Sequence, residues 1–261
     1  MNGSPLVFIT GASSGLGQAL ALRFHGAGYR LALVARRSDE VARWARGAGI
    51  DAGRFAVYTA DVRDVAATVA AGKACIAVQG VPDVVIANAG ISVGIDTADP
   101  ADLEVMRATL ETNVLGMAST FHPFVAAMQE RRSGRLVGIA SVAGIRGLPG
   151  HGAYCASKAA VIGYCESLRG EMRPSGVKVV TIAPGYIDTP LTRGNRYSMP
   201  FLMSAADFAD RAWKTIERGT SWRVIPWQMG IVVRLLRLIP NALFDRLLAG
   251  RPRKRRRTEA P

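Results

Sequence analysis

Short runs of apolar and β-branched residues alternate along this chain with stretches in which apolar residues recur at helical spacing. The runs Leu31 to Val34 and Val177 to Ile182 are nearly continuous in apolar residues, which is typical of parallel strands covered on both faces. This pattern predicts strands at 6–10, 30–35, 54–58, 82–87, 135–140, 177–183 and 222–225.

Helices are predicted between these strands, near 15–27, 39–48, 64–79, 101–129, 154–172 and 204–218. Such regular alternation predicts an α/β fold, a Rossmann-type, doubly wound parallel sheet with helices on both faces. The chain has 261 residues, 49% of them hydrophobic, and so is long enough to bury one large core. We therefore expect a single domain over residues 1–225, followed by an extension over 226–250 and a tail over 251–261.

Residues suited to ligand binding or catalysis follow the predicted strands. In sheets of this kind, ligands bind beyond the carboxyl ends of the strands, so these residues are expected to gather at one edge. They are Thr10-Gly11, Ala35-Arg36, Asp61, Asn88-Ala89-Gly90, Ser141 and Pro184-Gly185.

The turn from Thr10 to Gly17 joins the first strand to the first helix and contains three glycines. Glycine lets the backbone bend and approach a pyrophosphate, and the helix N-terminus offers free N–H groups and a partial positive charge. The alternative is a glycine-rich turn without a ligand, because such motifs also match by chance.

The end of the second strand bears on which dinucleotide is bound. An NAD-binding site usually places a carboxylate there, whereas this chain has Arg36 and Arg37 after Ala35. Two guanidinium groups can hold a 2′-phosphate, which predicts a preference for NADP(H). The alternative is a pair of solvated surface arginines.

Tyr154 and Lys158 open a predicted helix at positions i and i+4, so they share one face. A neighbouring ammonium favours the phenolate and lowers the pKa of a tyrosine. Ser141 ends the fifth strand, where its hydroxyl can stabilise charge that develops on a reacting oxygen. We expect these three residues to form a catalytic centre. Asn113 lies within an apolar helical stripe and is either a satisfied core amide or the holder of a water molecule that links Lys158 to solvent.

The composition bears on the cellular location of the protein and on the charge of its partners. Cys75, Cys155 and Cys165 are odd in number and lack metal-like spacing, so we expect free thiols, a cytoplasmic location and no metal. No signal segment is recognisable at the N-terminus. The net charge is +13, of which the last eleven residues carry +5. This charge suits an anionic partner such as a dinucleotide or a membrane surface.

Together, these residues resemble the short-chain dehydrogenase/reductase family over roughly residues 5 to 225, in its NADP-preferring branch. The resemblance rests on the T-G-x-x-x-G-x-G turn, Asp61, Asn88-Ala89-Gly90, Asn113, Ser141, Tyr154, Lys158 and Pro184-Gly185 with Thr189.

The resemblance implies a seven-stranded sheet and a homodimer or homotetramer built on the helices near 101–129 and 154–172. Tyr154 would act as general acid in reduction and general base in oxidation. Ser141 would orient the substrate oxygen, Lys158 would tune Tyr154 and bind ribose, and Asn113 would complete a proton relay. The cofactor-binding residues would be Gly11, Ser13, Ser14, Gly15, Leu16, Gly17, Arg36, Arg37, Asp61, Val62, Asn88, Ala89, Gly90, Tyr154, Lys158, Pro184, Gly185, Ile187 and Thr189.

Substrate choice is expected to depend on the loop after Pro184-Gly185, which extends to about Met203 and is rich in apolar and aromatic residues. This set suggests a lipophilic carbonyl or alcohol substrate, or alternatively a lid whose side chains pack against one another. It comprises Tyr186, Leu191, Tyr197, Met199, Phe201 and Leu202. His151 could touch substrate, or could be an ordinary, partly exposed loop histidine.

The extension over 226–250 has apolar residues at helical spacing, with polar residues opposite, which predicts an amphipathic helix, kinked at Pro240. The apolar set is Val232, Leu235, Leu236, Ile239, Leu243 and Leu247. The favoured interpretation is a helix packed on the core or on a partner subunit, followed by a disordered basic tail. The alternative is peripheral contact with an anionic membrane at its inner face. Nucleic-acid binding is not expected, because no aromatic residues interleave with the basic ones.

The sequence therefore predicts an NADP(H)-dependent oxidoreductase that transfers a hydride between nicotinamide and a carbonyl or secondary alcohol. The competing hypothesis is a catalytically silent, NADP-binding sensor or scaffold protein at a membrane surface.

Overall fold

A computed structural model describes residues 3–195, 197–250 and 252–257. Seven strands form one parallel sheet in the order β3-β2-β1-β4-β5-β6-β9. The strands are β1 (Leu6–Thr10), β2 (Arg30–Ala35), β3 (Phe55–Thr59), β4 (Val84–Ala87), β5 (Arg135–Ile139), β6 (Lys178–Pro184) and β9 (Trp222–Ile225). The predicted Rossmann-type, doubly wound sheet is therefore confirmed.

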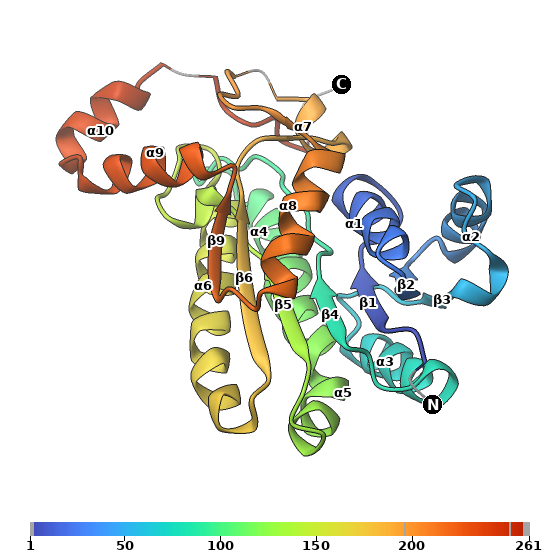
Figure 1. Ribbon diagram of the computed structural model, residues 1–261. Helices are drawn as coiled ribbons and strands as arrows, with labels where there is room; N and C mark the ends of the chain where they lie inside the picture. Colours follow the sequence, from blue (N-terminus) through green and yellow to red (C-terminus); the bar gives the residue numbers. More distant parts are fainter. Residues whose placement is uncertain (1–2, 196, 251, 258–261) are drawn as a thin grey trace.

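Helices cover both faces of this sheet (Figure 1). One face packs against α1 (Gly15–Gly26), α2 (Ser38–Gly47) and α8 (Ala205–Glu217). The other packs against α3 (Val65–Gln79), α5 (Gly116–Glu130) and α6 (Gly152–Met172). Neighbouring residues of a strand point to opposite faces, so Val7 and Ile9 enter the first core while Leu6 and Phe8 enter the second. Burial on both faces explains the nearly continuous apolar runs.

The helix predicted over 101–129 is divided into three pieces. α4 (Asp102–Leu110) leads into a π-helical turn over Glu111–Leu115, and α5 follows. Such turns insert one extra residue into the helical ladder and often occur at functional sites, and this one contains Asn113.

The chain reverses its direction of progress across the sheet between β1 and β4. From β1 it moves outward through β2 to β3, and it then returns to place β4 on the other side of β1. Ligands of doubly wound sheets bind at this switch point. The short strands β7 (Ile187–Asp188) and β8 (Met203–Ser204) form a separate pair, with α7 (Pro190–Arg193) between them.

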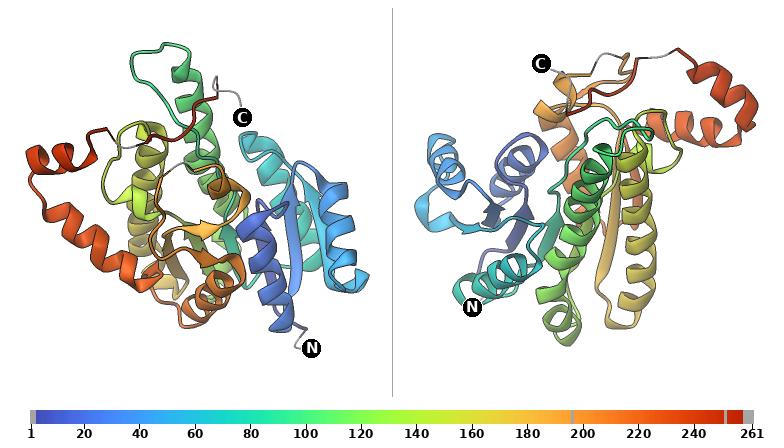
Figure 2. Two further views of the ribbon diagram at one scale, coloured as in Figure 1. Left: turned by 90° about the horizontal axis from the view of Figure 1, so that it is seen from above. Right: turned by 180° about the vertical axis from the view of Figure 1, so that it is seen from behind.

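Two helices follow the sheet and project from it beyond the carboxyl ends of the strands (Figures 1 and 2). They are α9 (Trp227–Leu238) and α10 (Asn241–Leu248). The sequence predicts one helix kinked at Pro240, but the structure has two helices, because proline cannot continue the hydrogen-bond ladder of α9. Within the described residues, none of the helices has the length and hydropathy needed to span a bilayer.

Candidate active site

The connection between β1 and α1 is a tight glycine turn braced by β4. Gly11 and Gly15 have φ values of 70° and 56°, in the region that favours glycine. A Cβ atom on Gly17 would lie 2.1 Å from the carbonyl oxygen of Gly11, so a larger residue requires the backbone to move. The amide of Asn88 donates hydrogen bonds to the carbonyl oxygens of Thr10 and Gly11, at 3.0 and 3.3 Å.

A cavity of about 680 Å³ runs along the carboxyl ends of the strands. Every residue that the sequence assigns to cofactor binding lines this cavity except Gly17, which packs against Gly11. The first turn of α1 contains no acidic residue, and its N-cap Ser14 makes no side-chain capping hydrogen bond. This helix end can therefore receive an anion. The cavity and its glycine turn fit a dinucleotide whose pyrophosphate lies at α1.

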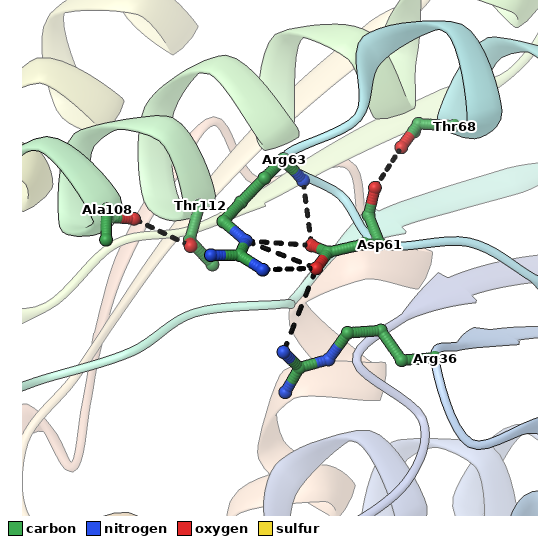
Figure 3. A network of polar contacts seen from close by, with 6 residues as sticks. All are labelled: Arg36, Asp61, Arg63, Thr68, Ala108 and Thr112. Carbon is green, nitrogen blue, oxygen red and sulfur yellow. Dashed lines mark hydrogen bonds and ion pairs between the residues drawn. The ribbon is translucent and has the colours of Figure 1, made fainter.

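Three charged side chains meet at the end of the cavity formed by β2 and β3 (Figure 3). Arg63 holds Asp61 through two nitrogens, with the closest contact at 2.7 Å, and Arg36 lies 3.8 Å from the same carboxylate. The Arg63 hydrogen bonds lower the pKa of Asp61, and Arg36 adds to this effect. The sequence prediction missed Arg63, because a basic residue two positions after an aspartate carries no signal on its own.

Ser141 and Tyr154 face each other at the boundary of the cavity. The Oγ atom of Ser141 accepts a hydrogen bond from the N–H of Ala143 at 3.1 Å, so its own proton stays available to another acceptor. Burial raises the pKa of Tyr154, and a hydrogen bond with Ser141 opposes this effect. The lowered pKa that the sequence predicts for Tyr154 beside Lys158 is therefore not observed, and the phenol is a neutral proton donor near pH 7.

Lys158 lies beside Tyr154 on the same face of α6, with its Nζ atom 5.8 Å from the centre of the phenol ring. It donates a hydrogen bond to the carbonyl oxygen of Ile139 at 2.7 Å. Burial lowers the pKa of Lys158 to about 8, since removal from water disfavours the charged form. The structure thus brings together the three residues expected to form the catalytic centre.

Asn113 is buried next to this group and does not line the cavity. Its amide bonds both the N–H and the carbonyl oxygen of Ile91, at 2.8 and 2.9 Å, and the hydroxyl of Ser157 at 2.9 Å. These bonds match the alternative of a satisfied core amide. The proton relay through Asn113 stays a prediction.

A second cavity, of about 140 Å³, adjoins the first on the side of α9 and α10. Ser141 and Tyr154 line both cavities. Its apolar wall includes residues of the C-terminal helices that the sequence did not assign to a site: Met229, Val233, Leu236 and Phe244. Of these four, helical spacing places only Leu236 on the predicted apolar face, and it does not indicate what that face contacts.

Arg146 fixes the C-terminal helices to the loop after Ser141. Its guanidinium donates to the carbonyl oxygens of Leu236 and Ile239, the latter at 2.8 Å, and lies 3.7 Å from the centre of the Phe244 ring. The carbonyl groups at a helix C-terminus lack partners within the helix, so the arginine completes the end of α9 and stacks on α10.

The loop expected to select the substrate contributes only in part. Tyr186, Leu191 and Tyr197 line the second cavity, whereas Phe201 and Leu202 are about half exposed. His151 lines it too and is buried, so the alternative of a partly exposed loop histidine is wrong. Its Nε2 atom lies 3.3 Å from the hydroxyl of Tyr197, and burial lowers its pKa.

The basic tail lies partly within the described residues. The sequence predicts disorder over 251–261, yet residues 252–257 contact the body of the protein: Lys254 lines the second cavity and Arg257 the first. Arg251 and residues 258–261 lie outside the described residues.

Comparison with known proteins shows the same architecture and sequence pattern. The family model for short chain dehydrogenases matches residues 5–199. An uncharacterized oxidoreductase of Myxococcus xanthus is 40% identical over 244 residues, which cover 91% of this chain and 93% of that protein.

Two solved structures illustrate the fold. A 3-oxoacyl-[acyl-carrier protein] reductase from Brucella melitensis with bound NAD is 30% identical, with a TM-score of 0.74, and the match covers 86% of this chain and 90% of that one. A short chain dehydrogenase from Burkholderia cenocepacia in complex with NADP has a TM-score of 0.80 at 23% identity, covering 94% and 98%.

Proposed function

Because this chain belongs to the short-chain dehydrogenase/reductase family, a family of oxidoreductases, we propose that it is an NADP(H)-dependent carbonyl reductase or alcohol dehydrogenase for a lipophilic substrate. One observation carries this proposal. Ser141 and Tyr154 line both the cavity that fits a dinucleotide and the adjoining apolar cavity, so a substrate oxygen can reach them where the two cavities meet.

The assignment to NADP(H) rests on Arg36 and Arg37, which line the cavity. The Burkholderia protein is in complex with NADP and the Brucella reductase has bound NAD, so the relatives support both dinucleotides. A guanidinium pairs with a phosphate through charge-assisted hydrogen bonds, and an unphosphorylated ribose gives it no such partner. When bound, the nicotinamide supplies or accepts the hydride.

The roles of the chain's own residues follow from their bonds. In reduction, the Tyr154 hydroxyl gives its proton to the substrate oxygen as negative charge develops there, and in oxidation the phenolate takes it back. Ser141, whose oxygen is occupied by the N–H of Ala143, donates its proton to the same oxygen. The Lys158 ammonium favours the phenolate through its charge and can reach a ribose hydroxyl.

A lipophilic substrate is supported by the composition of the second cavity. Met229, Val233, Leu236 and Phe244 give it an apolar wall, and apolar pockets with a few polar groups are typical of small-molecule sites. The C-terminal helices therefore contribute to substrate choice in this proposal.

The test is Tyr154→Phe, which removes the transferable proton while keeping the ring. We expect loss of NADPH oxidation with a panel of ketones and aldehydes, measured at 340 nm, while NADPH still binds in a fluorescence titration. The catalytically silent alternative makes another prediction, namely that the wild-type protein binds NADPH and turns over nothing on the same panel. A variant that keeps more than a few per cent of the wild-type rate would contradict the role of Tyr154.

We also propose peripheral contact with an anionic membrane. Its basis is now the set of exposed apolar residues on α9 and α10, and no longer the basic tail. Apolar side chains follow the outer face of α9 at steps of four, four and three residues and continue onto α10. They are Trp227, Ile231, Leu235, Leu238, Leu243 and Leu247, all exposed. The exposed Arg234, Arg237 and Arg246 flank them, and such a combination binds anionic lipid surfaces.

Co-sedimentation with phosphatidylglycerol vesicles tests this contact. Leu238 is 79% exposed, so Leu238→Glu is expected to reduce recovery with vesicles without unfolding the protein. Val78 on α3 is 72% exposed, and Val78→Glu is the matched control for an added charge elsewhere. Equal recovery of wild type and both variants would exclude the contact.

Two further parts of the proposal concern surroundings and assembly. Cys75, Cys155 and Cys165 are free and buried, which supports a reducing, cytoplasmic location. Exposed apolar side chains along the outer helices, such as Leu115 and Tyr164, support a homodimer or homotetramer. Light scattering measures the mass of this assembly in solution.

A further inference from the structure

Residues 252–257, here called the strap, lie beside the second cavity, which Lys254 lines. Arg256 holds the strap in place by donating to Asp102 at 2.7 Å and to Asp99. Asp102 is only 3% exposed, so its carboxylate is a buried partner for Arg256. A backbone hydrogen bond of 2.9 Å from Gly94 to Arg255 fixes the adjacent residue. The strap is therefore attached to the body directly after Lys254, through Arg255 and Arg256.

Lys254 is the strap residue that lines the second cavity. Its Nζ atom donates to the carbonyl oxygen of Leu191 at 2.8 Å and to the amide oxygen of Asn195 at 2.7 Å. Both acceptors are neutral, and within the described residues no carboxylate lies within 4 Å of this ammonium. One of its three N–H groups is left for another acceptor.

The second cavity thus holds a cation without a counter-ion in the described part of the chain. Withdrawing a charge from water is costly unless an opposite charge accompanies it, and burial accordingly lowers the pKa of Lys254. The neighbouring cation, Arg146, is engaged by carbonyl oxygens and by the ring of Phe244. His151, whose pKa is lowered by burial and by Lys254, is neutral near pH 7. A ligand with one negative charge would supply the missing partner.

We propose that Lys254 is an anion-binding subsite, and that the carbonyl substrate carries a carboxylate as well as an apolar body. The apolar body lies against α9 and α10, the carbonyl oxygen lies at Ser141 and Tyr154, and the carboxylate pairs with the free N–H of Lys254. A single ammonium matches a monoanion. The family model ends at residue 199, so the subsite lies in a part of the chain that the family pattern does not describe. This inference rests on the proposed reductase function and specifies its substrate class.

The kinetic test compares acids with amides of the same shape. The pairs are 4-carboxybenzaldehyde with 4-carbamoylbenzaldehyde, and 4-oxo-4-phenylbutanoate with its amide, which place the charge at two distances from the carbonyl carbon. The ratio of kcat/KM for acid over amide is expected to exceed one in the wild type for at least one pair. In Lys254→Met this ratio falls roughly 10- to 100-fold, the effect typical of one lost hydrogen bond to a charged group.

Two control variants separate the subsite from other roles of Lys254. Lys73→Met removes an exposed lysine on α3 and keeps the wild-type ratio, since a change of net charge alone does not act at the cavity. Lys254→Arg keeps the cation and restores most of the preference for the acid. Equal losses on acid and amide in Lys254→Met would assign Lys254 to holding the strap and overturn the proposal, as would a wild type that never prefers the acid.

A binding measurement keeps this inference distinguishable from the proposed function. Titration calorimetry of 4-(hydroxymethyl)benzoate and its amide into protein saturated with NADPH requires no turnover. Tighter binding of the acid, lost in Lys254→Met, supports the subsite even if no aldehyde is reduced, in which case the proposed function fails alone. Reduction of the amides, together with equal binding of acid and amide, overturns the subsite alone.

Discussion

Replacing Arg36 with alanine gives a quantitative test of the predicted preference for NADPH. The Arg36 side chain is 68% exposed and lies 3.8 Å from Asp61, so its field is largely screened by water. Two unit charges at about 4 Å interact by about 1 kcal/mol in water and by about 4 kcal/mol in the less polar surroundings typical of protein surfaces. The high exposure favours the lower part of this range, about 1 to 2 kcal/mol.

A loss of this size corresponds to a roughly 5- to 30-fold weaker interaction with NADPH. NADH has no 2′-phosphate, so its Michaelis constant is expected to change less than about 2-fold. The substitution also removes one of the two guanidinium groups beside Asp61, and the carboxylate then repels the phosphate more strongly. Arg36→Asp adds a second carboxylate beside the phosphate, so its effect is expected to be larger than that of Arg36→Ala.

The assay measures initial rates at 340 nm with NADPH and with NADH on one aldehyde, together with dissociation constants from fluorescence titration. Arg107→Ala is the matched control, because Arg107 is 65% exposed and paired with Glu104 and Glu111 but does not line the cofactor cavity. If the NADPH-to-NADH ratio of Arg36→Ala stays within 2-fold of the wild type, Arg36 is a solvated surface residue and the assignment to NADP(H) loses its basis.

Three further predictions concern pH, the glycine turn and the C-terminal helices. Lys158 has a pKa lowered to about 8. In the proposed mechanism only its charged form favours catalysis, so kcat/KM for reduction is expected to be level below about pH 8 and to fall above it. Lys158→Arg shifts that fall to higher pH, and an unshifted profile would contradict the argument. Gly17→Ala places a Cβ atom 2.1 Å from the Gly11 oxygen and is expected to cost about 1 to 3 kcal/mol of stability or more, seen as a lower Tm and weaker NADPH binding. The control Gly26→Ala adds a Cβ with no heavy atom within 4 Å, and an equal fall in Tm would refute the steric reasoning. Arg146→Met leaves the carbonyl groups at the end of α9 without their donor, and hydrogen exchange is expected to become faster over α9 and α10 while β1 and β4 keep their protection.

The sequence predicts the sheet well because its signal is local. A strand covered on both faces must be apolar along its length, and the predicted strands end within two residues of those observed, from Leu6–Thr10 to Trp222–Ile225. The glycine turn is equally readable, since positive φ values and close backbone contacts require glycine at Gly11 and Gly17. Residues that follow strands then converge, because the carboxyl ends of parallel strands lie at one edge.

The second cavity could not be predicted in the same way, because its contacts join distant parts of the chain. Helical spacing assigns Val232 and Leu235 to the apolar face, but α9, as Arg146 docks it, buries Val233 and leaves Leu235 exposed. Lys254 stands in a run of basic residues with no distinguishing neighbour, and its place in the cavity depends on the pairing of Arg256 with Asp102.

The contrast between the two cavities indicates how this protein combines a shared reaction with its own substrate. The family model covers residues 5–199, which contain the glycine turn, Ser141, Tyr154 and Lys158. The apolar wall and the strap come from residues 226–257, and they meet that core at Arg146 and Asp102. In the proposed function, proton transfer depends on the first part, whereas the second part adds substrate contacts. Substitutions in α9, α10 or the strap are therefore expected to change kcat/KM from one substrate to another while NADPH binding stays intact. Substitutions at Tyr154 or Lys158 are instead expected to slow every substrate together. A Leu236 or Lys254 variant that slows every substrate by one common factor would show that this division is wrong.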